Sequence, residues 1–513
     1  MDKEIDKNSK LVLGIGLALA YVPLLLGLKI ANVFFYSGIL VLLIQVVRLQ
    51  DKALEQLSSI SLNWKFFGSI FILMLATWSA AIATDYYSIE FSGFDTGIYA
   101  NLLTNFVKTG EYFSSILQLQ GLGNHFTANL MLLAPIYTVY PDFSVLLIAK
   151  LLAFFACPIL LYKLSQELVS KSSRLNFIAP LLWLISKPLG RTLEYEFQVS
   201  SLALPFILLT FLYAARLQYF RMLVFLIFLL GFKEHMPLAW VSLGIFIFLY
   251  QRKPKLGAAL IVAGIIAGLI IYTQVMPAFT TSGNFSHVHR FAPFSLVFSK
   301  IKLVFLALLS VGLLPFASPK SLLFIIPAFS LAFVSNDPNM LSFSFHYQDL
   351  PMSIVFVGVV CGLSALSAGT SWISRLENKK RFLIIASYLF IALLTNNRFP
   401  ARNIILHYPS NNDLQVIKDS NEFLKQYDDE IPLWTIDALV PYFSYAKNVR
   451  SITETAFLER EKSMHTIVLA EGINFWPIEE TGFQQLRSKL DAETKNGKYE
   501  LKSHGALSVY QKK

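Results

Sequence analysis

The sequence predicts an all-α polytopic membrane protein of about 11 to 13 transmembrane helices, followed by a small extracytoplasmic α/β domain. Of 513 residues, 55% are hydrophobic and 15% are charged, whereas soluble proteins carry roughly 25% charged residues. Many apolar runs approach the ~20 residues needed to cross a bilayer, and the charged stretch after residue 396 contains none. These observations exclude a soluble enzyme, a disordered protein and a disulfide scaffold. Both cysteines, Cys157 and Cys361, lie in apolar runs, so we expect them to be buried as small hydrophobic residues.

The predicted spans follow the apolar runs in order. The clear candidates are 11–28, 30–48, 65–83, 143–163, 200–215, 256–275, 302–317, 321–335, 351–368 and 382–396, with 176–186 as a weaker one. Residues 222–250 are interpreted as two short passes broken at 231–237, because a Gly, ionisable groups and a Pro cannot face lipid. The run 126–140 is short for a span, so an interfacial or re-entrant helix is expected there, with insertion as the alternative.

Lys and Arg set the predicted orientation, because they are concentrated in alternate connections between spans. This places the N-terminus in the cytoplasm, with the chain in the plasma (inner) membrane. The net charge of +10 is thereby explained as topology rather than as a sign of a nucleic-acid partner. The segments predicted to lie outside are 84–142 (the first loop), 187–199 (the second loop), 231–236, 277–299 and 336–350.

The composition changes after residue 396, which divides the chain into a transmembrane domain, 1–396, and a C-terminal domain, 397–513. An odd number of spans places the second domain outside. An amphipathic helix is expected at 411–427. Strands are expected at 431–437, 465–470, 499–503 and 506–511, the last two turning at His504–Gly505.

The first loop contains two candidate residues. Asp95 lies in SGFDTGIYANLLTNF, between two glycines and just before a helical pattern, where a helix cap is an equally good explanation. His125 lies in GLGNHFTANL, where a packing role at the interface is the alternative. In the second loop, Glu194 and Glu196 are two residues apart, and we expect one of them to be solvated.

Further candidates lie at the broken helix and beyond it. Placing Lys233 and Glu234 inside an apolar hairpin costs free energy, which favours a functional site over a pair that extends to the headgroups. Arg290 follows an H-x-H pattern that suits either a metal or anionic headgroups. His346 and Tyr347 lie where the chain re-enters a span.

These candidates share one predicted face of the membrane. Carboxylates, imidazoles and cations together can deprotonate an acceptor hydroxyl and neutralise a phosphate leaving group. Participation of a divalent cation, Mg²⁺ or Mn²⁺, stays open, because its oxygen ligands look like ordinary acids in a sequence. The predicted catalytic residue is Asp95, and the predicted substrate-binding residues are His125, Glu194, Glu196, Lys233, Glu234, Arg290, His346 and Tyr347.

The segments FDTGIYANLL, GNHFTANLM, FKEHMPLAW and FHYQDLP resemble the domain-of-unknown-function 2079 family of predicted membrane proteins, and the similarity runs across nearly the whole chain. That family is similar to the GT-C superfamily of integral-membrane glycosyltransferases, which use polyprenyl-phosphate-linked sugars on the outer side of the membrane. The resemblance implies that Asp95 is the general base or acceptor-orienting acid. It also implies that Lys233 and Glu234 match the polar break of a later span.

The chain departs from that pattern in places. Two apolar runs precede the acidic loop where many GT-C enzymes have one, and His235 stands where relatives often have an acid. The second loop has Glu196–Phe197–Gln198 where relatives often have a Phe–His pair, which weakens the case for catalysis by this loop.

The leading hypothesis is a GT-C-type glycosyltransferase with a polyprenyl-phosphate sugar as donor and an unknown lipid, glycan or protein as acceptor. Asp95 would take or orient the acceptor proton, and Lys233 with Arg290 would stabilise the departing phosphate. His125 and His346 would line the pocket or hold a cation with Asp95. The alternatives are a transporter or translocase of a lipid-linked glycan, suggested by the broken helix, and a non-catalytic membrane assembly protein.

Overall fold

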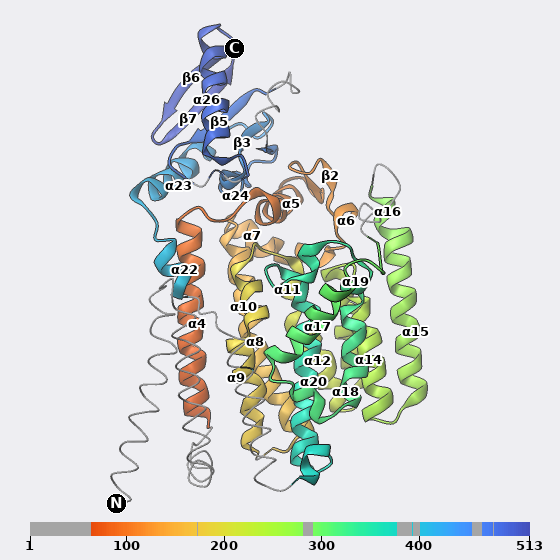
Figure 1. Ribbon diagram of the computed structural model, residues 1–513. Helices are drawn as coiled ribbons and strands as arrows, with labels where there is room; N and C mark the ends of the chain where they lie inside the picture. Colours follow the sequence, from red (N-terminus) through yellow and green to blue (C-terminus); the bar gives the residue numbers. More distant parts are fainter. Residues whose placement is uncertain are drawn as a thin grey trace, which may run out of the picture.

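The computed structural model describes residues 63–171, 173–280, 291–376, 392, 401–453, 464–473, 475 and 477–513. The described residues form a helical body with a mixed-sheet domain at one end, here called the domain-side end (Figure 1). The predicted spans 11–28 and 30–48, nearly all of 382–396, the H-x-H pattern and Arg290 lie outside the described residues.

In the part of the chain that the structure describes, four helices are long and apolar enough to cross a membrane. They are α4 (Trp64–Tyr87), α8 (Ser144–Leu168), Pro254–Ala278 and His346–Arg375. The third comprises α15 (Pro254–Ile270), η5 (Ile271–Val275) and α16 (Met276–Ala278), and the fourth is built around α20 (Asp349–Ser367). These helices confirm the predicted runs 65–83, 143–163, 256–275 and 351–368.

Shorter apolar helices fill the rest of the body. They include η2 (Ala128–Leu133) with α7 (Ala134–Val139), α9 (Ile178–Ile185), α11 (Val199–Leu202), α12 (Leu204–Ala215), α18 (Lys320–Ile325) and α19 (Ser330–Val334). The run 302–317 is not one helix: α17 (Val297–Ser310) ends before Gly312 and Leu313, which take left-handed backbone angles. The run 321–335 is likewise divided, between α18 and α19, by a 3₁₀ turn that contains Pro327.

The predicted break at 231–237 is confirmed. Helix α13 (Tyr219–Leu229) tightens into η4 (Leu230–Phe232), and Lys233 is extended. Helix α14 (Pro237–Tyr250) then begins with Pro237, a residue that suits the first helical turn because its missing N–H has no intrahelical partner there. The break therefore places three buried ionisable side chains between two apolar helices.

The first loop forms a layer between the body and the C-terminal domain (Figure 1). It contains η1 (Gly93–Gly97), α5 (Ile98–Thr109), a hairpin of β1 (Phe113–Ser114) and β2 (Leu119–Gln120), and α6 (Gly121–Asn124). Asp95 and His125 thus lie in the layer that joins the two parts.

The C-terminal domain is a five-stranded mixed sheet in the order β4-β3-β5-β7-β6, which confirms the predicted α/β class. Strands β3 (Leu433–Ile436), β5 (Thr466–Ala470), β6 (Tyr499–His504) and β7 (Leu507–Lys512) match the four predicted strands, and α23 (Asn411–Leu424) matches the predicted helix. Strand β3 runs parallel to both β4 (Val449–Ile452) and β5, whereas β7 is antiparallel to β5 and β6. Strand β4 and helix α26 (Glu479–Lys495) were not predicted.

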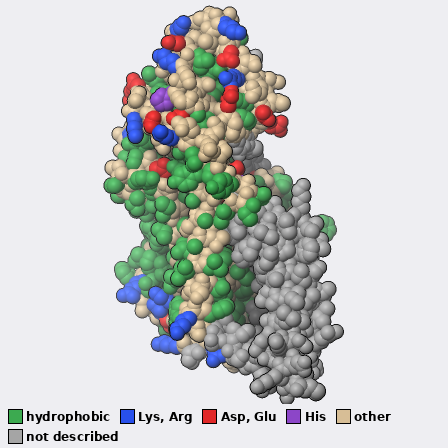
Figure 2. Space-filling model, turned by 90° about the vertical axis from the view of Figure 1, so that its left-hand side faces the viewer, with side chains coloured by type: hydrophobic (Ala, Val, Ile, Leu, Met, Phe, Trp, Pro, Cys, Tyr) green, Lys and Arg blue, Asp and Glu red, His purple; other side chains and the backbone are tan. Residues whose placement is uncertain are grey.

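The surface divides along the long axis of the molecule. Figure 2 shows a hydrophobic band over the helical body, the charged C-terminal domain above it, and Lys and Arg side chains at the opposite end. A hydrophobic band between two polar ends is what a bilayer requires of an integral protein.

Candidate functional site

Asp95 lies in a single π-helical turn that leads into α5. Its carboxylate accepts a hydrogen bond of 2.7 Å from the Tyr195 hydroxyl. The cap of the turn is instead Ser92, whose hydroxyl accepts from the Phe94 amide. The alternative explanation of Asp95 as a helix cap is therefore wrong, and its carboxylate belongs to a contact between the first and second loops.

Lys233 is buried at the helix break, with 3% of its surface exposed. Its ammonium donates to Gln198 Oε1 and to His346 Nε2, each at 3.0 Å. Because an ammonium only donates, His346 Nε2 accepts, which makes this imidazole neutral with its proton on Nδ1. Burial rules out the alternative in which Lys233 and Glu234 extend to the headgroups.

Glu234 connects the break to the first loop. One carboxylate oxygen lies 3.0 Å from His125 Nδ1, and the other accepts from the Phe126 amide at 3.2 Å. Burial alone would raise the pKa of Glu234, but His125, Lys233 and His235 together hold that pKa well below its usual range. Glu234 is therefore an ionised carboxylate that orients His125.

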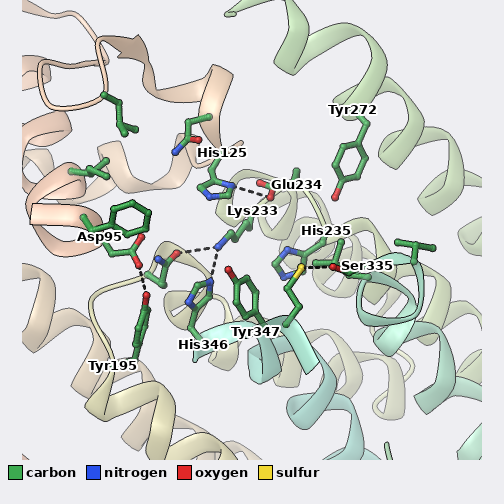
Figure 3. Close-up of a pocket in the computed structure, with 18 of the residues that line it drawn as sticks. Asp95, His125, Tyr195, Lys233, Glu234, His235, Tyr272, Ser335, His346 and Tyr347 are labelled. Atoms are coloured by element: carbon green, nitrogen blue, oxygen red, sulfur yellow. Dashed lines mark hydrogen bonds and ion pairs between the residues drawn. The ribbon is translucent and has the colours of Figure 1, made fainter. Parts of the chain in front are cut away.

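These groups surround one cavity of about 200 Å³ (Figure 3). Figure 3 shows Asp95 and Tyr195 on one side, with Lys233, His346 and Tyr347 between them and His235. An apolar wall completes the cavity and includes Phe94, Leu117, Phe291, Leu331, Val334 and Met340. The predicted residues that line it are Asp95, His125, Lys233, Glu234, His346 and Tyr347.

Two predicted residues lie elsewhere. Glu194 pairs with Arg191 at 3.1 Å, and its side chain is 6% exposed. Glu196 accepts from the amides of Ser92, at 2.7 Å, and Thr96, at 3.3 Å, and from the Thr96 hydroxyl. It lines a neighbouring cavity on the other side of Phe94 and Tyr195. The expectation that one of the two acids is simply solvated is wrong, because both are held by partners.

The second loop nevertheless contributes Tyr195 and Gln198 to the cavity, and sequence reasoning missed both roles. Its course is fixed from within the helical body. Lys150 of α8 donates to the carbonyls of Leu193, at 2.9 Å, and Tyr195, at 2.7 Å. Asp349 accepts from Thr192 at 2.6 Å and from Ser200 at 2.8 Å. A Lys in the middle of the apolar run 143–163 was the available signal for this network.

Burial favours the neutral forms of Asp95, His235 and Lys233. It raises the pKa of Asp95, although the hydrogen bond from Tyr195 and the charge of Lys233 oppose that rise. It lowers the pKa of His235 to about 4 and also lowers that of Lys233, against the attraction of Glu234 and Asp95. A carboxylate with a raised pKa is a better proton acceptor near neutral pH, so the cavity pairs a base with a cation.

Within the described ranges, no group of three or more His, Cys, Asp or Glu side chains is arranged to hold a metal ion. Asp95 is bonded to Tyr195, and Glu234 is paired with His125.

Apolar helices of membrane length, with a cavity of an acid, a cation and imidazoles at one end, define a multi-pass membrane protein with a candidate active site. The chain belongs to the DUF2079 family of predicted membrane proteins, whose family model matches residues 85–506. This confirms the family that its motifs resemble. No curated protein sequence matches the chain.

The structure is similar to two crystal structures of ArnT from Cupriavidus metallidurans. For ArnT bound to undecaprenyl phosphate, the identity is 10% and the TM-score is 0.48, with 87% of this chain and 98% of that chain covered. For the apo state, the identity is 10% and the TM-score is 0.49, with 86% and 97% covered. Likeness at this level assigns no activity or ligand to this chain.

Proposed function

We propose that this protein is an integral-membrane glycosyltransferase that transfers a sugar from a polyprenyl-phosphate donor to an acceptor on the outer face of the membrane. One observation carries the proposal: Asp95 and Lys233 line the same cavity at the domain-side end. The hydrogen bonds of the Lys233 ammonium in the described part of the chain go to neutral groups, Gln198 and His346, and the carboxylates of Glu234 and Asp95 attract its charge. We expect the same ammonium to bind an anion in the cavity. The GT-C resemblance of the sequence points the same way.

The reaction needs one proton acceptor and one stabilised leaving group. Asp95 takes the proton of the acceptor hydroxyl as that oxygen bonds to the anomeric carbon of the sugar. The bond from this carbon to the phosphate oxygen breaks, and its electron pair leaves with the lipid phosphate. Lys233 meets the added negative charge in a site shielded from water, where such stabilisation is strongest.

The two walls of the cavity suit the two parts of the donor. The polar wall, with Lys233 and His346, suits the phosphate, and the apolar wall around Leu331 and Val334 suits the first isoprene units. Helices α5, α6 and α19, which supply lining residues, lie at the domain-side end of the body (Figure 1). The cavity is thus at the height where a lipid headgroup would enter.

The outer location rests on charge. In Figure 2 the charged side chains at the end opposite the C-terminal domain are mostly Lys and Arg, whereas the domain carries charges of both signs. An excess of Lys and Arg marks the cytoplasmic side. With this orientation, the cavity and the C-terminal domain face outward. The position of the cavity at one end of the body favours an enzyme over a translocase. An assembly role would leave the acid and the cation in this cavity unexplained.

The test is transfer by the purified full-length chain in lipid nanodiscs, supplied with a panel of radiolabelled polyprenyl-phosphate sugars and a membrane extract as acceptor source. Unaltered protein should release the lipid phosphate and label an acceptor, and Asp95→Asn should reduce the rate by at least about 100-fold. Asp337→Asn, an acid outside this cavity, is the matched control and should retain activity. Transfer by Asp95→Asn at the unaltered rate, or flipping of a lipid-linked glycan without transfer, would contradict the proposal.

A further inference from the structure

The C-terminal domain touches the segment that carries Asp95. Asp437 begins η12 (Asp437–Leu439), directly after strand β3, and is 3% exposed. One carboxylate oxygen accepts from the Gly93 amide at 3.2 Å, and the other accepts from the Ser451 hydroxyl at 2.7 Å. Ser451 lies in β4, so the sheet itself orients the carboxylate toward the first loop.

The two glycines that flank Asp95 allow this contact. A Cβ atom on Gly93 would lie 2.7 Å from Val440 Cβ and 2.8 Å from an Asp437 carboxylate oxygen. A Cβ atom on Gly97 would lie 2.9 Å from a Val440 methyl group. Because α24 (Val440–Phe443) packs directly against the π-helical turn, any side chain at either position would force the domain and the segment apart.

The contact continues beyond the turn. The Asn101 amide donates to the Ala446 carbonyl at 3.3 Å, and the Ser115 hydroxyl donates to the Val449 carbonyl at 2.7 Å. Lys108 donates to the Tyr445 carbonyl at 2.7 Å. The first loop and the C-terminal domain are therefore one packed unit.

A second acid holds the same turn from the other side. Glu196 of the second loop accepts from the amides of Ser92 and Thr96, and the Phe197 amide donates to the Thr96 hydroxyl at 3.0 Å. Residues 92–97 are consequently fixed between two carboxylates, neither of which lines the cavity. Asp95 is the side chain of this clamped turn that accepts from Tyr195 and lines the cavity.

We propose that Asp437 is a positioning residue: by holding the Gly93 amide, the C-terminal domain sets the position of Asp95 relative to Lys233 across the cavity. This rests on the proposed function, because Asp95 matters as the base of the transfer. The C-terminal domain is then a part of the active-site framework rather than a separate module for binding a partner.

Two substitutions of Asp437 separate its hydrogen bonds from its bulk. In Asp437→Asn the amide oxygen can accept from Gly93 while the amide nitrogen donates to Ser451, so activity should stay within about 3-fold. Asp437→Leu has a similar shape but no acceptor, and its kcat should fall about 10- to 100-fold, with KM for the donor unchanged, because misplacement of a reacting group costs rate.

The matched control is Asp429→Leu, which removes an acid of the same domain that pairs with Lys108 of the first loop, away from the turn. Its kcat should stay within about 3-fold, because α5 keeps its other contacts with the domain. Should Asp437→Leu not fold, Ser451→Ala frees the same carboxylate, and its kcat should fall about 5- to 10-fold, beyond the range expected of the controls.

Hydrogen exchange of a peptide that covers residues 91–98 gives a readout independent of activity. Exchange should be faster in Asp437→Leu than in unaltered protein, Asp437→Asn or Asp429→Leu. Unaltered kcat and exchange in Asp437→Leu, or an equal loss of kcat in Asp429→Leu, would overturn the positioning role. An exchange difference in a chain that transfers no sugar would support the contact and overturn the proposed function.

Discussion

The Tyr195 hydroxyl donates a hydrogen bond of 2.7 Å to the carboxylate of Asp95. The bond joins the second loop to the first, so the candidate base is oriented by a residue far from it in the sequence. Tyr195 is in turn held through its backbone carbonyl by Lys150. The position of Asp95 therefore depends on the first loop, the second loop, the helical body and the C-terminal domain together.

Tyr195→Phe should change the pH dependence of transfer. A hydrogen bond to the ionised form lowers the pKa of a carboxyl, so losing it adds to the rise that burial already causes for Asp95. The base is then ionised only at higher pH, and the acidic limb of the pH–rate profile should move upward. The measurement is kcat/KM between pH 5 and 9. Tyr499→Phe, which loses a bond inside the sheet domain, should keep the original limb, and an unmoved limb in Tyr195→Phe would refute the orienting role.

Lys233→Met should weaken binding of the lipid phosphate without unfolding the protein. Removal of the buried ammonium leaves His346 Nε2 without this donor but also removes the desolvation cost of the charge, so melting should fall by only a few degrees, whereas affinity for polyprenyl phosphate should fall at least about 10-fold. Lys233→Arg should not restore binding, because a planar guanidinium cannot replace a point charge that fits between Gln198 and His346.

The shift in melting temperature on adding polyprenyl phosphate measures this binding. The control is Lys498→Met, a surface lysine paired with Glu493. An equal ligand-induced shift in Lys233→Met and in the control would show that Lys233 does not meet the phosphate.

Glu234→Gln should destabilise the protein in a pH-dependent way. The pKa of Glu234 is lowered in the folded state, so its ionisation adds stability that is present above the unfolded value of about 4.3 and is lost as pH falls below it. The apparent melting temperature of the variant should lie several degrees below that of the unaltered protein at pH 7, and this difference should become smaller by pH 4. A difference in melting temperature that does not change with pH would contradict an ionised Glu234.

Hydropathy and local chemistry were enough to predict the long helices, the break at 231–237 and six residues of the cavity. Each of these residues, such as Asp95 or His346, is polar and lies beside an apolar run, where a local pattern reveals it. Tyr195 and Gln198 were not predicted to line the cavity, because the charged residues of the same segment, Glu194 and Glu196, were chosen instead. Which side of this segment faces the cavity depends on Lys150, a contact that no local pattern records.

In the C-terminal domain, too, some features could be predicted from local patterns and others could not. Strand β4 is four residues long, and its position in the sheet depends on its pairing with β3. Helix α26 could have been predicted, because Phe483, Leu486 and Leu490 recur at helical spacing and are all buried. The contact of Asp437 with Gly93 joins residues 344 positions apart, so only the fold could reveal it.

Lys150→Met should reduce both stability and rate, because it acts on the second loop from within α8. Lys150 is 1% exposed, and its ammonium is the donor to the Leu193 and Tyr195 carbonyls. A Met side chain fills similar space but leaves two carbonyls without that donor, a loss of about 1 to 3 kcal/mol for each buried group. The loop should then relax, so Tyr195 no longer holds Asp95 and kcat should fall about 10-fold or more.

The measurements are the apparent melting temperature and kcat, with Lys163→Met, in the same helix, as the control. Binding of polyprenyl phosphate should persist in Lys150→Met, because Lys233 keeps its contact with His346 on another element. Lys150→Met therefore differs from Lys233→Met, in which ligand binding is the property that is lost first. If Lys150→Met lost ligand binding but kept its melting temperature, Lys150 would belong to the binding site itself rather than to the support of the second loop.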